Sequence, residues 1–269
     1  MRLSLVRSGY WTVAALLLLT PSAGARILKT KRSASSTWTP WSAIVIGSGL
    51  EVQSNSQETE YDFPLLLEYN FSEQLKLSLE PNFVYLAAKS RDARTTGGLG
   101  DLETAVEYEF LRERRYQPAL SAQGLIKWPT ATNPDLGTPG YDYSLGLFAS
   151  KDLVYVDVDL NLLYTFVGDP AQSDNLQIAL AVEYHLNRRF DIIAEAVTTI
   201  GGGGVRGLSG TLTGLGNATE GSRSGNETEG TVGVAWHASK YLKFEQGVTY
   251  KSDSSWQLVL AWEWSFGGN

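Results

Sequence analysis

The sequence predicts an all-β fold: a transmembrane, antiparallel, up-and-down β-barrel of about twelve strands that follows a cleaved signal peptide. Three observations lead to it. Segments of about ten residues alternate apolar and polar side chains, the pattern of a strand with two different faces. The connections between these segments alternate between short and long. Aromatic side chains gather at both ends of the segments, as in the two aromatic girdles of a membrane barrel.

The N-terminus has the pattern of a secretory signal. Arg2 and Arg7 precede an apolar run over residues 13–19, and Ala23-Gly24-Ala25 follows it. A basic start, a short apolar core and an Ala-x-Ala end predict a signal peptide over residues 1–25, cut after Ala25. A membrane anchor is the alternative, but the run is shorter than a spanning helix requires.

Residues 26–42 are first basic and then rich in Ser and Thr, without a clean period. They fit either a periplasmic tail or a segment tucked into the barrel lumen. The barrel itself is expected over residues 43–269.

The composition of the chain narrows the classes of partner that it can bind. Removal of Arg2 and Arg7 from the 22 basic residues leaves 20, against 29 acidic residues. This acidic balance argues against nucleic acid. The chain has no cysteine, which excludes disulfides and zinc-thiolate sites. We expect no cofactor.

One hairpin shows the strand pattern most clearly. Apolar or aromatic side chains occupy every second position from Leu176 to Leu186, with Gln, Ala, Glu and His between them. A polar turn at residues 187–189 reverses the chain, and the alternation resumes to about Thr199. Strands of this length match the 9–11 residues needed to cross a bilayer, whereas strands of soluble domains average about 5–6.

The same pattern recurs along the chain. The expected strands cover residues 43–53, 59–70, 74–87, 99–111, 116–128, 140–150, 153–167, 175–186, 189–200, 228–238, 241–251 and 255–266. Short turns are expected at 71–73, 112–115, 150–152, 187–188 and 238–240. Longer loops are expected at 54–58, 88–98, 129–139, 168–174 and 201–227, and the loop at 252–254 is brief. Pro64, Pro81 and Pro118 predict bulges or strand ends, and Gln246 on the apolar face suggests a further bulge or a shift of phase.

The side chains decide which face lies inside. A soluble lipocalin-like barrel or β-sandwich would also alternate, with its apolar face inward. Here long charged side chains stand within the strands on the minority face, and aromatics of the other face form two bands. The minority face therefore lines the lumen; its candidates are Glu68, Glu107, Lys127, Asp157, Asp159, Glu183, Glu195, Lys243, Glu245 and Glu263.

The lumen side chains admit two interpretations. A ring of carboxylates in a narrow pore would favour cations. Alternatively, the carboxylates pair with Lys76, Lys127, Lys243 and Arg189 in a network that fills a small barrel. His185 and His237 lie on the same face near short turns, where they fit solvated lumen histidines. We expect no enzymatic activity, no catalytic residues and no metal site.

One stretch resembles a known family. It consists of Gly97-Gly98-Leu99-Gly100-Asp101-Leu102-Glu103, then Glu107-Tyr108-Glu109-Phe110, then Lys127-Trp128-Pro129-Thr130. In order and spacing it resembles the MetA-pathway phenol-degradation family of outer-membrane transporters, loosely over residues 59–266. Ala131 stands where the family has glycine, and Gly267-Gly268-Asn269 follows the aromatic Phe266. The resemblance implies a role beside aromatic-compound catabolism and a C-terminal signal for the outer-membrane assembly machinery. The Gly98-x-Gly100-Asp101 element predicts a loop-to-strand turn with Asp101 and Glu103 pointing into the lumen.

These observations predict an outer-membrane channel of a Gram-negative-type bacterium. It would pass or bind a small solute passively, with aromatic and other hydrophobic compounds among the candidates. The alternative is a closed structural barrel that anchors or interacts at the membrane without a pore. Expected partners are outer-membrane lipid, the solute and the assembly machinery.

Overall fold

The structure, a computed structural model, describes residues 43–54, 58–89, 95–201, 226–252 and 255–266. The expected signal peptide, the segment 26–42 and most of the loop 201–227 lie outside the described residues. Within the described parts most of the chain is strand.

The strands follow one another along the chain. They are β1 (Ile44–Ser54), β2 (Glu58–Asn70), β3 (Leu75–Glu80), β4 (Asn82–Ala88), β5 (Thr96–Leu99), β6 (Leu102–Leu111), β7 (Ala119–Trp128), β8 (Asp142–Asp152), β9 (Val156–Phe166), β10 (Asn175–His185), β11 (Phe190–Gly201), β12 (Glu227–His237), β13 (Leu242–Lys251) and β14 (Trp256–Phe266). A 3₁₀ helix, η1 (Pro134–Leu136), lies between β7 and β8. No helix in these described parts is long and apolar enough to cross a membrane.

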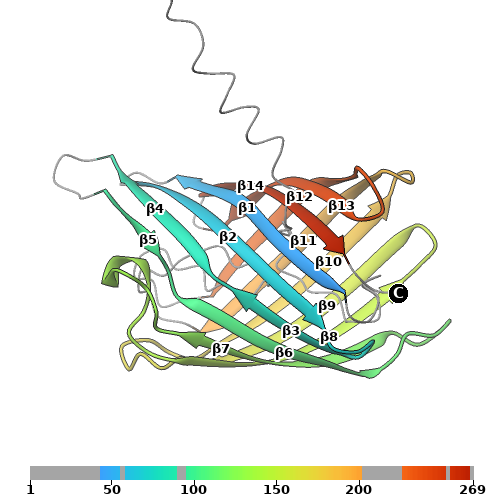
Figure 1. Cartoon of the computed structure of the whole chain (residues 1–269), viewed down its shortest axis with the longest axis horizontal. Helices are drawn as coiled ribbons and strands as arrows, with labels where there is room; N and C mark the ends of the chain where they lie inside the picture. Colours follow the sequence, from blue (N-terminus) through green and yellow to red (C-terminus); the bar gives the residue numbers. More distant parts are fainter. Residues whose placement is uncertain (1–42, 55–57, 90–94, 202–225, 253–254, 267–269) are drawn as a thin grey trace, which may run out of the picture.

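The strands close into a twelve-stranded antiparallel barrel, as predicted. β3 and β4 follow each other along β2 and form one wall strand, and β5 and β6 form another against β4 and β3. β1 pairs with β14 on one side and with β2 on the other, which closes the barrel between its first and last strands. β5 pairs with β4 alone. Figure 1 shows the strands tilted around the barrel. A sheet that spans a membrane must close into a barrel, because an unpaired backbone group in hydrocarbon costs several kcal/mol.

Pro81 and Pro118 lie at strand ends, as predicted, whereas Pro64 lies inside β2 without a change of register, so the bulge or strand end expected there was wrong. Pro81 separates β3 from β4, and its carbonyl accepts a hydrogen bond from the Leu65 amide at 3.0 Å. Pro64 is the last residue of β2 in the ladder with β4, and Pro118 directly precedes β7. Gln246 points outward in an unbroken register with both neighbours, so the suggested bulge there was wrong.

The connections divide between two ends of the barrel. At one end, here called the short-turn end, lie the connections 71–74, 112–118, 153–155, 186–189 and 238–241, together with Ile44 and Phe266. One turn differs from its prediction. Residues 150–152 belong to β8, where Asp152 pairs with Asp157, and the reversal falls at 153–155. The other end, here called the long-loop end, carries the connections 89–95, 129–141 and 167–174 among its loops.

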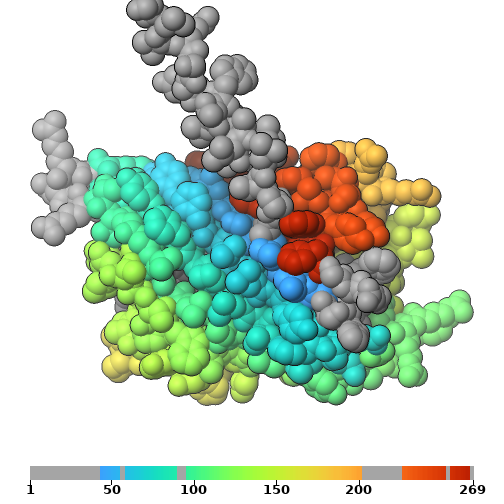
Figure 2. Space-filling model, viewed as in Figure 1, coloured from blue at the N-terminus to red at the C-terminus, as the bar shows by residue number. Residues whose placement is uncertain are grey.

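The apolar face points outward. Leu160 and Leu180 are 43% and 46% exposed, whereas Asp157 and Glu195 on the other face are 4% and 6% exposed. In the view of Figure 2, side chains of β1, β2 and β4 form a continuous outer wall. This orientation confirms the prediction and excludes a soluble barrel with an apolar interior.

Aromatic side chains mark both rims of this apolar surface. At the short-turn end the exposed aromatics include Tyr69, Phe71, Tyr108, Phe110, Tyr184 and Trp236, and at the long-loop end Phe63, Trp128, Tyr143, Phe166, Tyr250 and Trp256. Such girdles sit at the two membrane–water interfaces of transmembrane barrels.

The inner face of the described strands is mostly polar but carries apolar patches, two of which consist of strand residues alone. The larger one joins Ala181, Ile193, Ala235, Val259 and Ala261, with Leu66 of β2 packed against it. β1 lies between β2 and β14, and two of its inward positions are Gly47 and Gly49. The smaller patch joins Ala105, Leu125 and Leu163 on β6, β7 and β9.

Candidate functional site

All ten side chains chosen from the sequence stand at inward positions of their strands. Glu68 lies on β2, Glu107 on β6, Lys127 on β7, Asp157 and Asp159 on β9, Glu183 on β10, Glu195 on β11, Lys243 and Glu245 on β13, and Glu263 on β14. The structure gathers most of them, with further residues, into clusters around lysines and histidines.

The first cluster lies on β2, β3 and β6. The Lys76 ammonium is 3.1 Å from Glu107 and 3.5 Å from Glu68. The Ser121 hydroxyl donates to Glu107 at 2.7 Å. Glu107 is 1% exposed. A buried carboxylate of this kind is tolerated because it is both paired and hydrogen-bonded.

The second cluster lies at the long-loop end. Lys127 is 2.7 Å from Asp142 and 3.6 Å from Asp101, and it also donates to the Thr138 hydroxyl. These residues come from β7, β8, the β5–β6 junction and the loop 129–141. The loop therefore lies against the inner wall.

Apolar packing confirms that the loop 129–141 folds inward. Leu136 of η1 is fully buried against Val84 and Leu86, which are inward residues of β4. At Gly98 on β5, a Cβ would lie 2.2 Å from the Thr132 hydroxyl and 3.1 Å from Leu136. Glycine at this position gives the loop room to approach the wall.

Asp101 fastens this loop. One carboxylate oxygen accepts from the Ala131 amide at 3.0 Å and the other from the Thr138 amide at 2.9 Å. The Thr130 hydroxyl accepts from the Leu102 amide at 2.9 Å. Two of the three motifs that carry the family resemblance, at residues 97–103 and 127–130, thus meet around the loop. Asp101 points inward as predicted, but its role in holding the loop was not apparent from the sequence.

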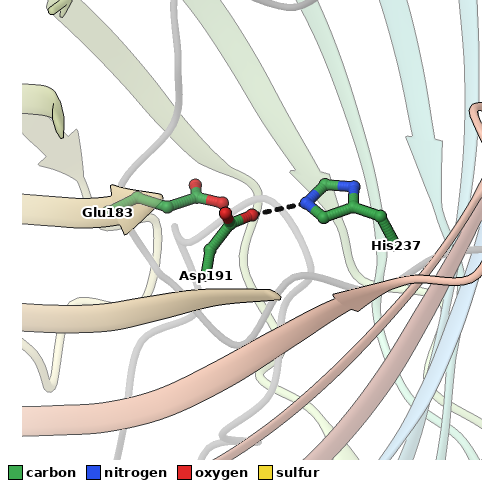
Figure 3. A group of neighbouring side chains, drawn as sticks. All are labelled: Glu183, Asp191 and His237. Atoms are coloured by element: carbon green, nitrogen blue, oxygen red, sulfur yellow. Dashed lines mark hydrogen bonds and ion pairs between the residues drawn. The ribbon is translucent and has the colours of Figure 1, made fainter. Parts of the chain in front are cut away.

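The third cluster lies at the short-turn end and contains both histidines. The His185 Nδ1 is 3.0 Å from Asp191, and its Nε2 is 3.0 Å from Asp157. The His237 Nε2 contacts the second oxygen of Asp191. Figure 3 shows His237 and Glu183 converging on Asp191. The side chains of His185 and His237 are 34% and 37% exposed, in keeping with solvated lumen histidines, and each ring also contacts a buried carboxylate, which the sequence did not predict.

Lys243 extends the third cluster to β13. Its ammonium is 2.7 Å from Glu245 and 3.3 Å from Glu183. Asp191, which joins the histidines, was not among the candidates. The register between β10 and β11 identifies this residue, because Asp191 stands directly opposite His185 across the turn.

A fourth group closes the seam between β1 and β14. Lys251 is 2% exposed and donates to Gln53 at 2.6 Å, and Gln257 donates to Glu51. The network interpretation of the lumen charges therefore describes the lysines well. Carboxylates nevertheless outnumber lysines on the inner face of the described strands.

Comparison with known proteins shows what this architecture is similar to. No family model and no curated protein matches the sequence. Among solved structures, the COG4313 outer membrane channel from Pseudomonas putida F1 matches 84% of this chain and 96% of its own, with a TM-score of 0.65 and 14% identity. A KdgM porin in complex with disordered oligogalacturonate matches 83% of this chain and 99% of its own, with a TM-score of 0.56 and 12% identity.

The chain has the fold of outer-membrane β-barrels. A NanC porin gives the same result, with a TM-score of 0.57, 12% identity, and coverage of 82% of this chain and 98% of its own. At these identities the likeness concerns the fold. The phenol-degradation family stays a resemblance of motifs.

Proposed function

We propose that this chain is an outer-membrane channel that passes a small solute passively. The observation that carries the proposal is the closed barrel with an apolar outer band and a charged inner face. The similar structures are described as a channel and as porins, which supports the same conclusion. A twelve-stranded barrel is narrower than 16–18-stranded porins, which fits a small solute.

The charges of the inner face favour cationic or neutral solutes. Lys76, Lys127 and Lys243 each contact two carboxylates, so carboxylates outnumber ammonium groups in these contacts. Carboxylates lining a narrow passage attract cations and repel anions.

The inner wall also holds buried apolar side chains. Two apolar patches interrupt the charged wall: the larger one contains Ala181 and Ala261, and the smaller one contains Leu125. Their side chains are 0–4% exposed, so a solute with an apolar part, such as an aromatic compound, would contact them only where neighbouring lumen side chains move aside. This is the compound class that the motif resemblance implies.

A closed barrel without a pore is the second candidate. It is favoured by the inward loop 129–141 and by the low exposure of the inner side chains, such as 1% for Glu107 and 3% for Asp159. In that case the lumen network would stabilise a membrane anchor.

Planar-bilayer recording separates the two candidates. A channel gives stepwise conductance, with a reversal potential on the cation side under a salt gradient. Glu68→Gln neutralises one acid of the Lys76 cluster and should reduce cation preference. Glu73→Gln, on an exposed turn, is the matched control. An absence of conductance favours the closed barrel, and anion selectivity rejects the acid-lined pathway.

A further inference from the structure

Three neighbouring strands place metal-ligating side chains at one point of the lumen wall. Asp191 on β11 stands opposite His185 on β10, and Glu183 lies two residues before His185 on the same inward face. On the other side, Asp191 stands opposite Ala235 of β12, and His237 lies two residues further. Diagonal neighbours of this kind are within reach of long side chains. The register therefore brings Glu183, Asp191 and His237 together, as Figure 3 shows.

The donor atoms are close enough to share one ion. One donor atom each from Glu183, Asp191 and His237 lie within 4.8 Å of one another. Tetrahedral ligands around Zn²⁺ at their usual bond lengths are separated by about 3.4 Å. Small side-chain rotations close that difference.

The electrostatics of the group also favour a cation. Glu183 and Asp191 are 5% and 2% exposed, so little water separates the two carboxylates. Two buried carboxylates at this distance repel each other unless a positive charge lies between or beside them. Lys243 supplies part of that charge to Glu183 at 3.3 Å. A divalent ion between the three donors would supply more.

The neighbouring histidine holds Asp191 in a suitable orientation. His185 contacts one oxygen of Asp191 at 3.0 Å and is itself held by Asp157 at 3.0 Å. The other oxygen of Asp191 points to His237. Ligating carboxylates in metal sites are commonly fixed by such outer hydrogen bonds.

We propose that Glu183, Asp191 and His237 form a binding site for a divalent transition-metal ion at the short-turn end of the lumen. One imidazole and two carboxylates suit Zn²⁺ or Cu²⁺ better than Ca²⁺ or Mg²⁺, which prefer oxygen ligands alone. Binding replaces the hydrogen on the His237 Nε2 with the metal and displaces the Lys243 ammonium from Glu183. Three protein ligands leave a coordination position for water or a solute in the lumen.

The first test is calorimetric titration of the untagged, metal-stripped protein in detergent with Zn²⁺. We expect one site. His185→Ala should weaken it about 10–100-fold, the usual cost of losing an outer-shell partner, and Asp191→Asn or His237→Gln should weaken it more. Lys243→Met should tighten it, because a competing cation is removed. Glu68→Gln, an inward carboxylate of the Lys76 cluster, is the matched control and should leave it unchanged.

The second test identifies the nitrogen ligand with Cu²⁺ and electron paramagnetic resonance. The sequence has only two histidines, so nitrogen coupling reports on these alone. We expect coupling to one imidazole that persists in His185→Gln and disappears in His237→Gln. Heat-dependent gel migration confirms that each variant is folded. The proposal is overturned if the wild-type protein binds Zn²⁺ no more tightly than His237→Gln does. It is also overturned if the nitrogen coupling disappears in His185→Gln and persists in His237→Gln.

Discussion

The loop 129–141 provides the sharpest test of how the motifs act. Asp101 accepts two backbone hydrogen bonds from this loop, and it is 8% exposed. In Asp101→Asn the charge is lost, and only the remaining amide oxygen can accept. Hydrogen bonds to a charged group contribute about 1.5–3 kcal/mol each, so the docked loop should lose about 3 kcal/mol. This corresponds to about a 100-fold larger fraction of undocked loop, since about 1.4 kcal/mol is tenfold.

Limited proteolysis of the folded barrel measures this fraction, because cleavage follows the population of the open form when opening is fast. We expect Asp101→Asn to be cut within residues 129–141 about 100-fold faster than wild type. Asp135→Asn makes the same charge change at an exposed position of the same loop and serves as the control. Equal cleavage rates for the two variants would refute the assignment of Asp101 as the residue that holds the loop.

Two further predictions concern stability, measured as the free energy of unfolding in denaturant by tryptophan fluorescence. Lys76→Met leaves two buried carboxylates without their shared cation and should cost about 3–5 kcal/mol, whereas Arg112→Met in an exposed ion pair should cost under about 1 kcal/mol; similar losses would contradict the buried network. Leu160→Arg places a charge in the outer apolar band and should cost about 2–4 kcal/mol, against about 0–1 kcal/mol for Phe166→Arg at the rim. Equal costs for these two would contradict a lipid-facing orientation.

The fold could be predicted because its signals are local. Alternation along one strand, such as β10, fixes which side chains share a face without knowledge of any partner strand. The position of charges such as Asp157 and Glu195 then decides which face is lined by water. The break between β3 and β4 could be predicted for the same reason, because Pro81 has no backbone N–H to donate, whichever strand lies beside it.

The site could be predicted only in part, because its contacts depend on register between strands. Asp191 gave no signal by itself. Its role follows from a turn length that places it opposite His185 and diagonal to His237. The inward position of the loop 129–141 could not be predicted, for a different reason. Residues 129–141 have the polar, proline-containing composition of an external loop. The role of Leu136 becomes apparent only when Val84 and Leu86 form the wall against which it packs.

The lumen clusters share an asymmetry that links stability to selectivity. In each of the groups around Lys76, Lys127 and Lys243, one ammonium lies between two carboxylates. Loss of one acid leaves a neutral pair, whereas loss of the lysine leaves two buried like charges. Acid variants should therefore fold and change ion preference, while lysine variants should first lose stability. The same excess of carboxylates over lysines allows a lumen carboxylate such as Glu183 to exchange the Lys243 ammonium for a divalent cation.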